Sequence, residues 1–250
     1  MSTLAITTFS EDGYNLYGKK MIRTWLQYWP KSYKLRIYAE HDLEVDDPRV
    51  EIVQLHEVSP ALVKFKQTSQ LMLEQTTDKK LRNKILKTVK WCHKVYAMGH
   101  ALNKETFYNY LIFLDADTYT KDTVPQGQLE SLSEKCLFSV HFEYLHKMRH
   151  YETGLIIFNL KHQQINDLKE YITSAYDTLE IYEMPKGWDG FWIAEMAAQR
   201  GYHVEDLTHG RRGIFTNPLV RDILHHDAGK DKYVGTNYNK FTGTRKDTIN

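Results

Sequence analysis

The chain of 250 residues is 42% hydrophobic and 26% charged, an ordinary globular composition that excludes a disordered tail protein. Its 33 basic and 32 acidic residues give a formal net charge of +1, so the overall charge indicates no particular partner. No apolar run approaches the roughly 18 residues of a membrane span, and Cys92 and Cys136 are too few for a disulfide framework, so we expect a cytoplasmic protein.

The first 55 residues predict a β-α-β-β order. Leu4–Thr8 is short, apolar and β-branched, as in a strand, and a polar turn follows it. Residues 14–29 carry apolar side chains at helical spacing until Pro30 ends the pattern, and 34–39 and 50–55 predict two further strands. This order is typical of a doubly wound nucleotide-binding half.

Helix-like and strand-like segments continue to alternate along the chain. Residues 60–103 predict helix, and the apolar segment 110–114 predicts a strand at the centre of the sheet. Further strands are predicted at 137–141 and 155–158, helices at 162–179 and 190–200, and a loop-rich tail over the last forty residues. We expect one α/β domain with a nucleotide-sugar-binding half (1–120), an acceptor and catalytic half (121–207) and a segment that closes on a metal site (208–250).

Two acidic residues follow the most apolar strand. Asp115 and Asp117 stand two positions apart, and if the strand geometry persists their carboxylates point the same way. Like charges this close repel unless a cation lies between them, and carboxylate oxygens bind Mg²⁺ or Mn²⁺. The pattern predicts a metal ion that anchors a diphosphate at the carboxyl edge of the sheet. The alternative is that the two residues only cap a turn.

Two other classes of protein use an Asp-x-Asp pattern, and the neighbouring residues disfavour both. A phosphatase of the haloacid dehalogenase type requires Thr or Val two positions after the second aspartate, where this chain has Tyr119. A calcium-binding EF-hand loop requires glycine at its sixth position, where Thr120 stands.

The tail contributes a second pattern, His226-x-x-Gly229-x-x-Lys232. Imidazole is a suitable ligand for Mn²⁺, glycine permits a close approach of the backbone to phosphate, and lysine adds a positive charge. The pattern predicts a third metal ligand and a diphosphate clamp in one short loop. The alternative is a solvated tail.

Four motifs in this order resemble the GT-A-fold glycosyltransferases: LIFLDAD (111–117), YETGLIIFN (151–159), WDGFW (188–192) and HxxGxxK (226–232). The order is similar to that of glycogenin-like retaining enzymes, and residues 6–30 resemble short glycosyltransferases of phages and marine bacteria. The resemblance spans roughly residues 4–232 and implies a Rossmann-like, mixed and mostly parallel sheet flanked by helices. It also implies a nucleotide-diphosphate sugar as donor, a UDP-sugar being favoured, and Mn²⁺ or Mg²⁺ as cofactor.

The resemblance assigns roles to individual residues. It implies that the ion is held by Asp115, Asp117 and His226, the diphosphate by Gly229 and Lys232, and the rest of the donor by Thr7, Thr8, Tyr14 and Lys94.

Two carboxylates are candidates for the catalytic centre. Glu152 lies just before a strand and would hydrogen-bond sugar hydroxyls, the alternative being a plain turn. Asp189 would act as a general base in an inverting enzyme or orient the sugar in a retaining one, the alternative being a helix N-cap. Trp188 and Trp192 would offer aromatic platforms to a sugar, although the aromatic content of 13% also fits an ordinary aromatic core.

Charge is segregated along the chain. Residues 78–94 hold seven basic side chains and one acidic side chain, and on a helix Lys80, Lys84, Lys87 and Lys94 fall roughly on one face. Such a stripe fits a polyanion, either a nucleic-acid backbone or the donor diphosphate. The alternative is a solvated helix face.

We therefore expect a metal-dependent glycosyltransferase that moves a sugar to an acceptor hydroxyl. The basic stripe favours acceptor binding by Lys80, Lys84 and Lys87, and the acceptor expected is a hydroxymethylated base of the 5-hydroxymethylcytosine type in double-stranded phage DNA. The protein would then act in the host cytoplasm. A capsule or lipopolysaccharide saccharide is the alternative acceptor, and a non-catalytic nucleic-acid-binding protein on the same fold is a third hypothesis.

Overall fold

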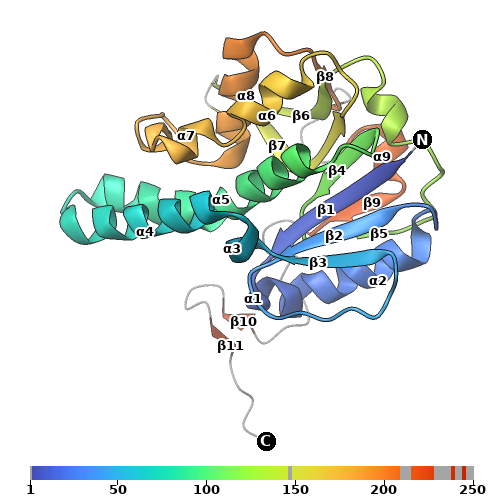
Figure 1. The fold of residues 1–250 in the computed structure, drawn as a ribbon, viewed down its shortest axis with the longest axis horizontal. Coiled ribbons are helices and arrows are strands. Elements are labelled where there is room, and N and C mark those ends of the chain that lie inside the picture. The colour runs from blue at the N-terminus through green and yellow to red at the C-terminus, as the bar shows by residue number, and fades with distance from the viewer. Residues whose placement is uncertain (1, 146–147, 209–214, 228–237, 240–243, 246–250) are drawn as a thin grey trace, which may run out of the picture.

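A seven-stranded sheet carries helices on both of its faces, as the computed structural model in Figure 1 shows. The structure describes residues 2–145, 148–208, 215–227, 238–239 and 244–245. The strand order in the sheet is β3-β2-β1-β4-β7-β6-β8. The strands of this sheet are β1 (Thr3–Phe9), β2 (Lys34–Ala39), β3 (Val50–Gln54), β4 (Tyr110–Leu114), β6 (Phe138–Leu145), β7 (Met148–Asn159) and β8 (Val204–Asp206).

Two smaller strand pairs lie outside this sheet. They are formed by β5 (Thr118–Thr120) with β9 (Leu224–His226) and by β10 (Tyr238–Asn239) with β11 (Thr244–Arg245). The longer helices are α2 (Lys19–Tyr28), α4 (Pro60–Gln75), α5 (Lys79–Lys104) and α8 (Asp189–Arg200). The short helical segments are α1 (Glu11–Gly13), η1 (Tyr14–Gly18), α3 (Leu55–Val58), η2 (Glu130–Ser133), α6 (Ile165–Tyr171), α7 (Ser174–Asp177), η3 (Glu180–Tyr182) and α9 (Pro218–Arg221).

The sheet is mixed and mostly parallel, as predicted. β1 pairs in parallel with β2 and β4, β2 with β3, and β6 with β8, whereas β7 runs antiparallel to both of its neighbours. β4 is the central strand and all five of its residues are buried, in agreement with the apolar pattern of 110–114. The carboxyl ends of the parallel strands therefore meet at one edge, where open α/β sheets bind ligands.

Side-chain alternation along the strands builds a core on each face of the sheet. Leu4 and Ile6 pack with α5 and α8 on one face, and Ala5 packs with α2 on the other. Trp25 and Trp29 are buried in the second core, so a large part of the aromatic content has a packing role. Beyond the sheet, α4 and the first half of α5 project as a helical hairpin (Figure 1).

The expected helix over 162–179 is the main departure from the predicted elements. It is divided into α6 and α7, and at the break a serine hydroxyl competes with helical main-chain hydrogen bonding. The Ser174 hydroxyl donates to the carbonyl of Tyr171 at 2.9 Å, and the Thr173 hydroxyl donates to Asp177 Oδ2 at 2.7 Å. The strands expected at 137–141 and 155–158 are longer than predicted and form a hairpin with a bulge between Val140 and His141.

None of the helices in the described part of the chain combines the length and the apolar character that crossing a membrane requires.

Candidate functional site

The two aspartates that follow β4 lie in a tight turn. The condition that strand geometry persists through them is not met, because β4 ends at Leu114. The amide of Thr118 donates to the carbonyl of Asp115 at 2.9 Å and closes the turn, while the amide of Asp115 donates to the carbonyl of Gly154 in β7 at 3.0 Å. The turn, rather than an extended strand, brings Asp115 and Asp117 to the same place.

His226 reaches the two aspartates through the strand pair β5 and β9. Thr118 stands opposite His226 in this pair, and the amide of Asp227 donates to the carbonyl of Asp117 at 3.0 Å. His226 Nε2 lies 2.8 Å from Asp117 Oδ1 and 3.6 Å from Asp115 Oδ2. One ligand atom from each of the three residues falls within 4.8 Å of the others.

The donor set of this cluster fits a divalent cation. Neither ring nitrogen of His226 is aligned for a hydrogen bond with the described residues, although Nε2 is close to two carboxylates. Buried polar atoms of this kind are rare unless they have a partner. Two carboxylate oxygens suit Mn²⁺ or Mg²⁺, and the imidazole nitrogen favours Mn²⁺, the softer of the two ions. Without an ion, the two carboxylates outweigh the effect of burial and raise the pKa of His226 to about 9.

Lys94 supplies a second positive charge to the same cluster. Its ammonium lies 2.7 Å from Asp115 Oδ1 and 3.6 Å from Asp189 Oδ2. Burial disfavours the charged amine, but Asp115 and then Asp189 raise the pKa of Lys94 above its usual range. Burial likewise opposes ionisation of Asp115, yet Lys94 and then His226 hold the pKa of that carboxyl well below its usual range. The site is therefore a compact arrangement of alternating charges.

Asp189 and Glu152 complete the cluster of carboxylates. Asp189 is the first residue of α8, so it is not the N-cap, and its Oδ2 accepts a hydrogen bond of 2.5 Å from the Thr153 hydroxyl. Glu152 lies in β7, and burial, followed by the charge of Asp115, raises its pKa to about 7. Thr153 is a residue that the sequence argument missed as a support for Asp189, although it lies within the motif quoted there.

The residues expected to hold the nucleotide lie at the end of β1 and in η1. Thr7 is fully buried and its hydroxyl has no hydrogen-bond partner among the described residues, whereas the half-buried Thr8 donates to a carbonyl of β2 at 2.8 Å. Tyr14 is half-buried between Phe9 and His41, with both ring centroids 5.7 Å away. Thr8 and Tyr14 thus offer surface at this edge, and Thr7 does not.

Two expected donor residues, Gly229 and Lys232, lie outside the described residues.

The expected acceptor residues, with one exception, line a single groove beside the site. Lys80, Lys84, Lys87 and Trp188 belong to its walls. Trp192 does not, and its expected role is wrong: it is 4% exposed, packs in the core, and its Nε1–H donates to the carbonyl of Ile172 at 2.7 Å. The reason is that Trp188 is the extended N-cap residue that precedes α8, whereas Trp192 lies inside α8 on the face that packs into the core.

Comparison with known proteins identifies the fold. No protein-family model matches the chain, and no curated protein matches its sequence. Solved structures do match: mouse xyloside xylosyltransferase 1 has a TM-score of 0.53 at 11% identity, covering 83% of this chain and 85% of that one. A glycosyltransferase involved in glycosylation of the major capsid of PBCV-1 has a TM-score of 0.53 at 13% identity, covering 94% and 96%. The galactosyltransferase LgtC, in complex with donor and acceptor sugar analogs, has a TM-score of 0.50 at 10% identity, covering 91% and 87%.

Proposed function

We propose that this chain, whose fold is that of the GT-A glycosyltransferases, transfers a sugar from a nucleotide-diphosphate sugar to an acceptor hydroxyl with the help of a divalent cation. The observation that carries the proposal is the convergence of Asp115, Asp117 and His226 within 4.8 Å at the carboxyl edge of the sheet. Residues more than a hundred positions apart meet there on a fold whose solved examples include sugar transferases.

The three residues would hold Mn²⁺ or Mg²⁺, which supplies positive charge to a diphosphate leaving group. Lys94 orients Asp115 and Asp189 by its ion pairs and adds a fixed charge on the side of the donor. Thr153 fixes the rotamer of Asp189 through its hydrogen bond. Asp189 and Glu152 would then contact the hydroxyls of the transferred sugar, with Thr8 and Tyr14 near the nucleotide.

We propose retention of the anomeric configuration and a UDP-sugar as donor, following the resemblance to glycogenin-like enzymes. NMR of the first product formed distinguishes retention from inversion by the coupling constant of the new anomeric proton. A panel of UDP-, GDP-, ADP- and TDP-sugars identifies the base.

The central experiment combines binding and turnover. Thermal melting is measured with nucleoside diphosphates and nucleotide sugars, with and without Mn²⁺, because a ligand that binds the native state raises the melting temperature. Release of nucleoside diphosphate from each donor is measured in parallel. We expect a stabilisation that requires both Mn²⁺ and nucleotide, and a slow Mn²⁺-dependent hydrolysis of one donor.

Asp117→Asn keeps the shape of the side chain and removes its charge. It should abolish the Mn²⁺-dependent stabilisation and lower turnover by about 100-fold or more, because a preorganised charge at the leaving group is lost. Asp46→Asn, at an exposed position away from the cluster, is the matched control and should behave like the wild type. Full turnover by a correctly folded Asp117→Asn protein contradicts the proposal.

The groove beside the carboxylate cluster, rather than the cluster itself, bears on the class of acceptor. Both the expected hydroxymethylated DNA base and the alternative saccharide require a surface next to Asp189, and the groove lined by Lys80, Lys87 and Trp188 is such a surface. The acceptor hydroxyl would attack the anomeric carbon from this side.

A further inference from the structure

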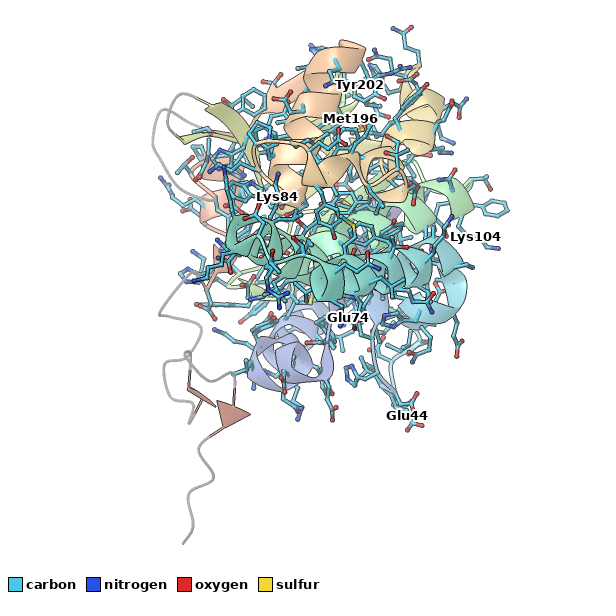
Figure 2. The ribbon with its side chains drawn as sticks, turned by 90° about the vertical axis from the view of Figure 1, so that its left-hand side faces the viewer. Glu44, Glu74, Lys84, Lys104, Met196 and Tyr202 are labelled. Carbon is cyan, nitrogen blue, oxygen red and sulfur yellow. The ribbon has the colours of Figure 1, made fainter. Side chains whose placement is uncertain are left out.

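The groove beside the site lies between α5 and the segment that leads into α8. It has a volume of about 540 Å³ and is lined by the first turns of α5 and by residues 182–188. Figure 2 labels Lys84 where α5 meets this segment. Trp188 lines the groove and immediately precedes Asp189 in the chain, so the groove lies next to the segment that carries Asp189 into the carboxylate cluster.

Contacts between α5 and the segment 182–188 fix the spacing of the two walls of the groove. The Lys84 ammonium donates to the carbonyl of Tyr182 at 2.8 Å and also to that of Met184. A Cβ atom on Gly187 would lie 2.2 Å from Thr88 Oγ1, so the segment approaches α5 as closely as a glycine allows. Lys84 therefore has a positioning role, because two of its three N–H groups are used by the wall.

The groove carries more positive than negative charge. Lys80, Lys84, Lys87 and Lys186 line it together with two acidic residues, Asp78 and Glu183. The Asp78 carboxylate caps α5, since its Oδ1 accepts a hydrogen bond of 2.8 Å from the amide of Lys80. Lys80 and Lys87 are exposed, so their ammonium groups are available to a ligand in the groove.

These lysines are aligned with the site. Lys80, Lys87 and Lys94 stand seven residues apart on α5, which puts them on one face in steps of about 10 Å. Lys94 is the member of the series that contacts Asp115 and Asp189. A row of positive charge thus runs along α5 from the far end of the groove into the cluster.

An aromatic surface lies at the end of this row. Trp188 is half-buried, its ring centroid is 6.4 Å from that of Trp91, and the Lys186 ammonium lies 5.4 Å from its centre. An indole face suits the apolar face of a sugar ring, while the adjacent ammonium suits an anionic substituent.

We propose that the groove binds the acceptor and that this acceptor is an anionic saccharide, carrying carboxylate or phosphate groups that contact Lys80 and Lys87 while one ring packs on Trp188. This inference rests on the proposed function. A volume of about 540 Å³ matches sites for small organic ligands, about 300–1,000 Å³.

The test measures binding to the groove without donor or metal, so that its result is independent of catalysis. Quenching of tryptophan fluorescence is followed with tetragalacturonate, with a tetrasaccharide phosphorylated on its terminal sugar, with uncharged maltotetraose and with a 20-base-pair duplex. The first two probes distinguish a carboxylate from a phosphate ligand. We expect at least one of them to bind, more weakly as salt concentration rises, and at least about tenfold more tightly than maltotetraose.

Lys80→Glu/Lys87→Glu should weaken binding of the anionic probe by about tenfold or more, because two attractive charges become repulsive. Lys64→Glu/Lys135→Glu, at two exposed positions outside the groove, is the matched control and should leave binding unchanged. Binding of no saccharide, equal binding of maltotetraose, or an unchanged affinity in the Lys80/Lys87 variant overturns the proposal. Tighter binding of the duplex that depends on Lys80 and Lys87 overturns it in favour of nucleic acid.

Mn²⁺-dependent nucleotide binding by the same wild-type preparation tests the proposed function separately. Groove binding without nucleotide binding refutes the transferase and not the groove ligand, and the reverse result refutes the groove ligand alone.

Discussion

Replacing Gly190 by alanine tests how the start of α8 positions the carboxylate cluster. Gly190 is the second residue of α8, directly after Asp189. A Cβ atom on Gly190 would lie 2.0 Å from the carbonyl oxygen of Tyr151 in β7 and 3.5 Å from Thr153 Cγ2. Non-bonded heavy atoms at optimal separation are about 3.5 Å or more apart, so the first turn of α8 must move away from β7 by about 1 Å or more.

The two effects of this substitution have opposite signs. Helix propensity alone predicts that glycine to alanine stabilises a helix by about 0.5–1 kcal/mol. Overpacking against a main-chain carbonyl, which cannot rotate away as a side chain does, predicts a loss of about 1–3 kcal/mol. We expect the second effect to dominate, so Gly190→Ala should lower the free energy of unfolding in urea.

The shift should affect activity more than stability. Asp189 is held by the 2.5 Å hydrogen bond from Thr153 and lies 3.6 Å from the Lys94 ammonium, and both distances change when α8 moves. A misplacement of about 1 Å lowers turnover by about 100-fold. Mn²⁺-dependent donor hydrolysis is the assay, and Thr153→Val, which removes the hydrogen bond without a clash, is the companion variant. A Gly190→Ala protein with wild-type turnover and an equal or higher free energy of unfolding refutes this reasoning.

Two further predictions concern buried charge. Lys94→Met leaves the carboxylates of Asp115 and Asp189 without their counter-charge, so without metal it should lower the free energy of unfolding by about 3–5 kcal/mol. Mn²⁺ should add more to the free energy of unfolding of this variant than to that of the wild type. If urea unfolding shows that Mn²⁺ stabilises both proteins equally, Lys94 does not supply the counter-charge of this cluster. His141 is fully buried, and burial lowers its pKa from 6.5 to about 4. Because the unfolded chain takes up a proton below pH 6.5 and the folded chain only below about pH 4, stability is present above pH 6.5 and is lost as the pH falls through this window. His141→Gln should therefore reduce the loss of the free energy of unfolding between pH 7 and pH 4 by about 3 kcal/mol. An unchanged pH dependence of urea unfolding in this variant would show that burial of the His141 imidazole does not cause the acid destabilisation.

Sequence patterns predicted the elements whose signal is local. The alternation and β-branching of 34–39 and the apolar run of 110–114 each coincide with a strand, and Gly201 ends α8 in the left-handed conformation with a φ of 64°. The order of the motifs also identified the fold, which the matching solved structures confirm.

Features that depend on tertiary contacts were not predictable from the pattern. At the division between α6 and α7, the Ser174 hydroxyl bonds to a main-chain carbonyl and competes with the helical hydrogen bonds that the apolar pattern predicts. Trp188 and Trp192 look equivalent in sequence, but only the contact of α8 with the sheet decides which of them is buried. The support of Asp189 by Thr153 needs the approach of α8 to β7, which no local signal encodes.

The pairing of β5 with β9 makes the proposed metal site sensitive to strand register. His226 stands opposite Thr118, while its neighbour His225 stands opposite Tyr119, with the two rings 4.9 Å apart. Adjacent side chains of a strand point to opposite sides, so a slip of one position would turn His226 away from the aspartates and present a different residue. The third ligand is thus specified by main-chain alignment, and inserting a single residue into β9 would disable the site while leaving every ligand in the sequence.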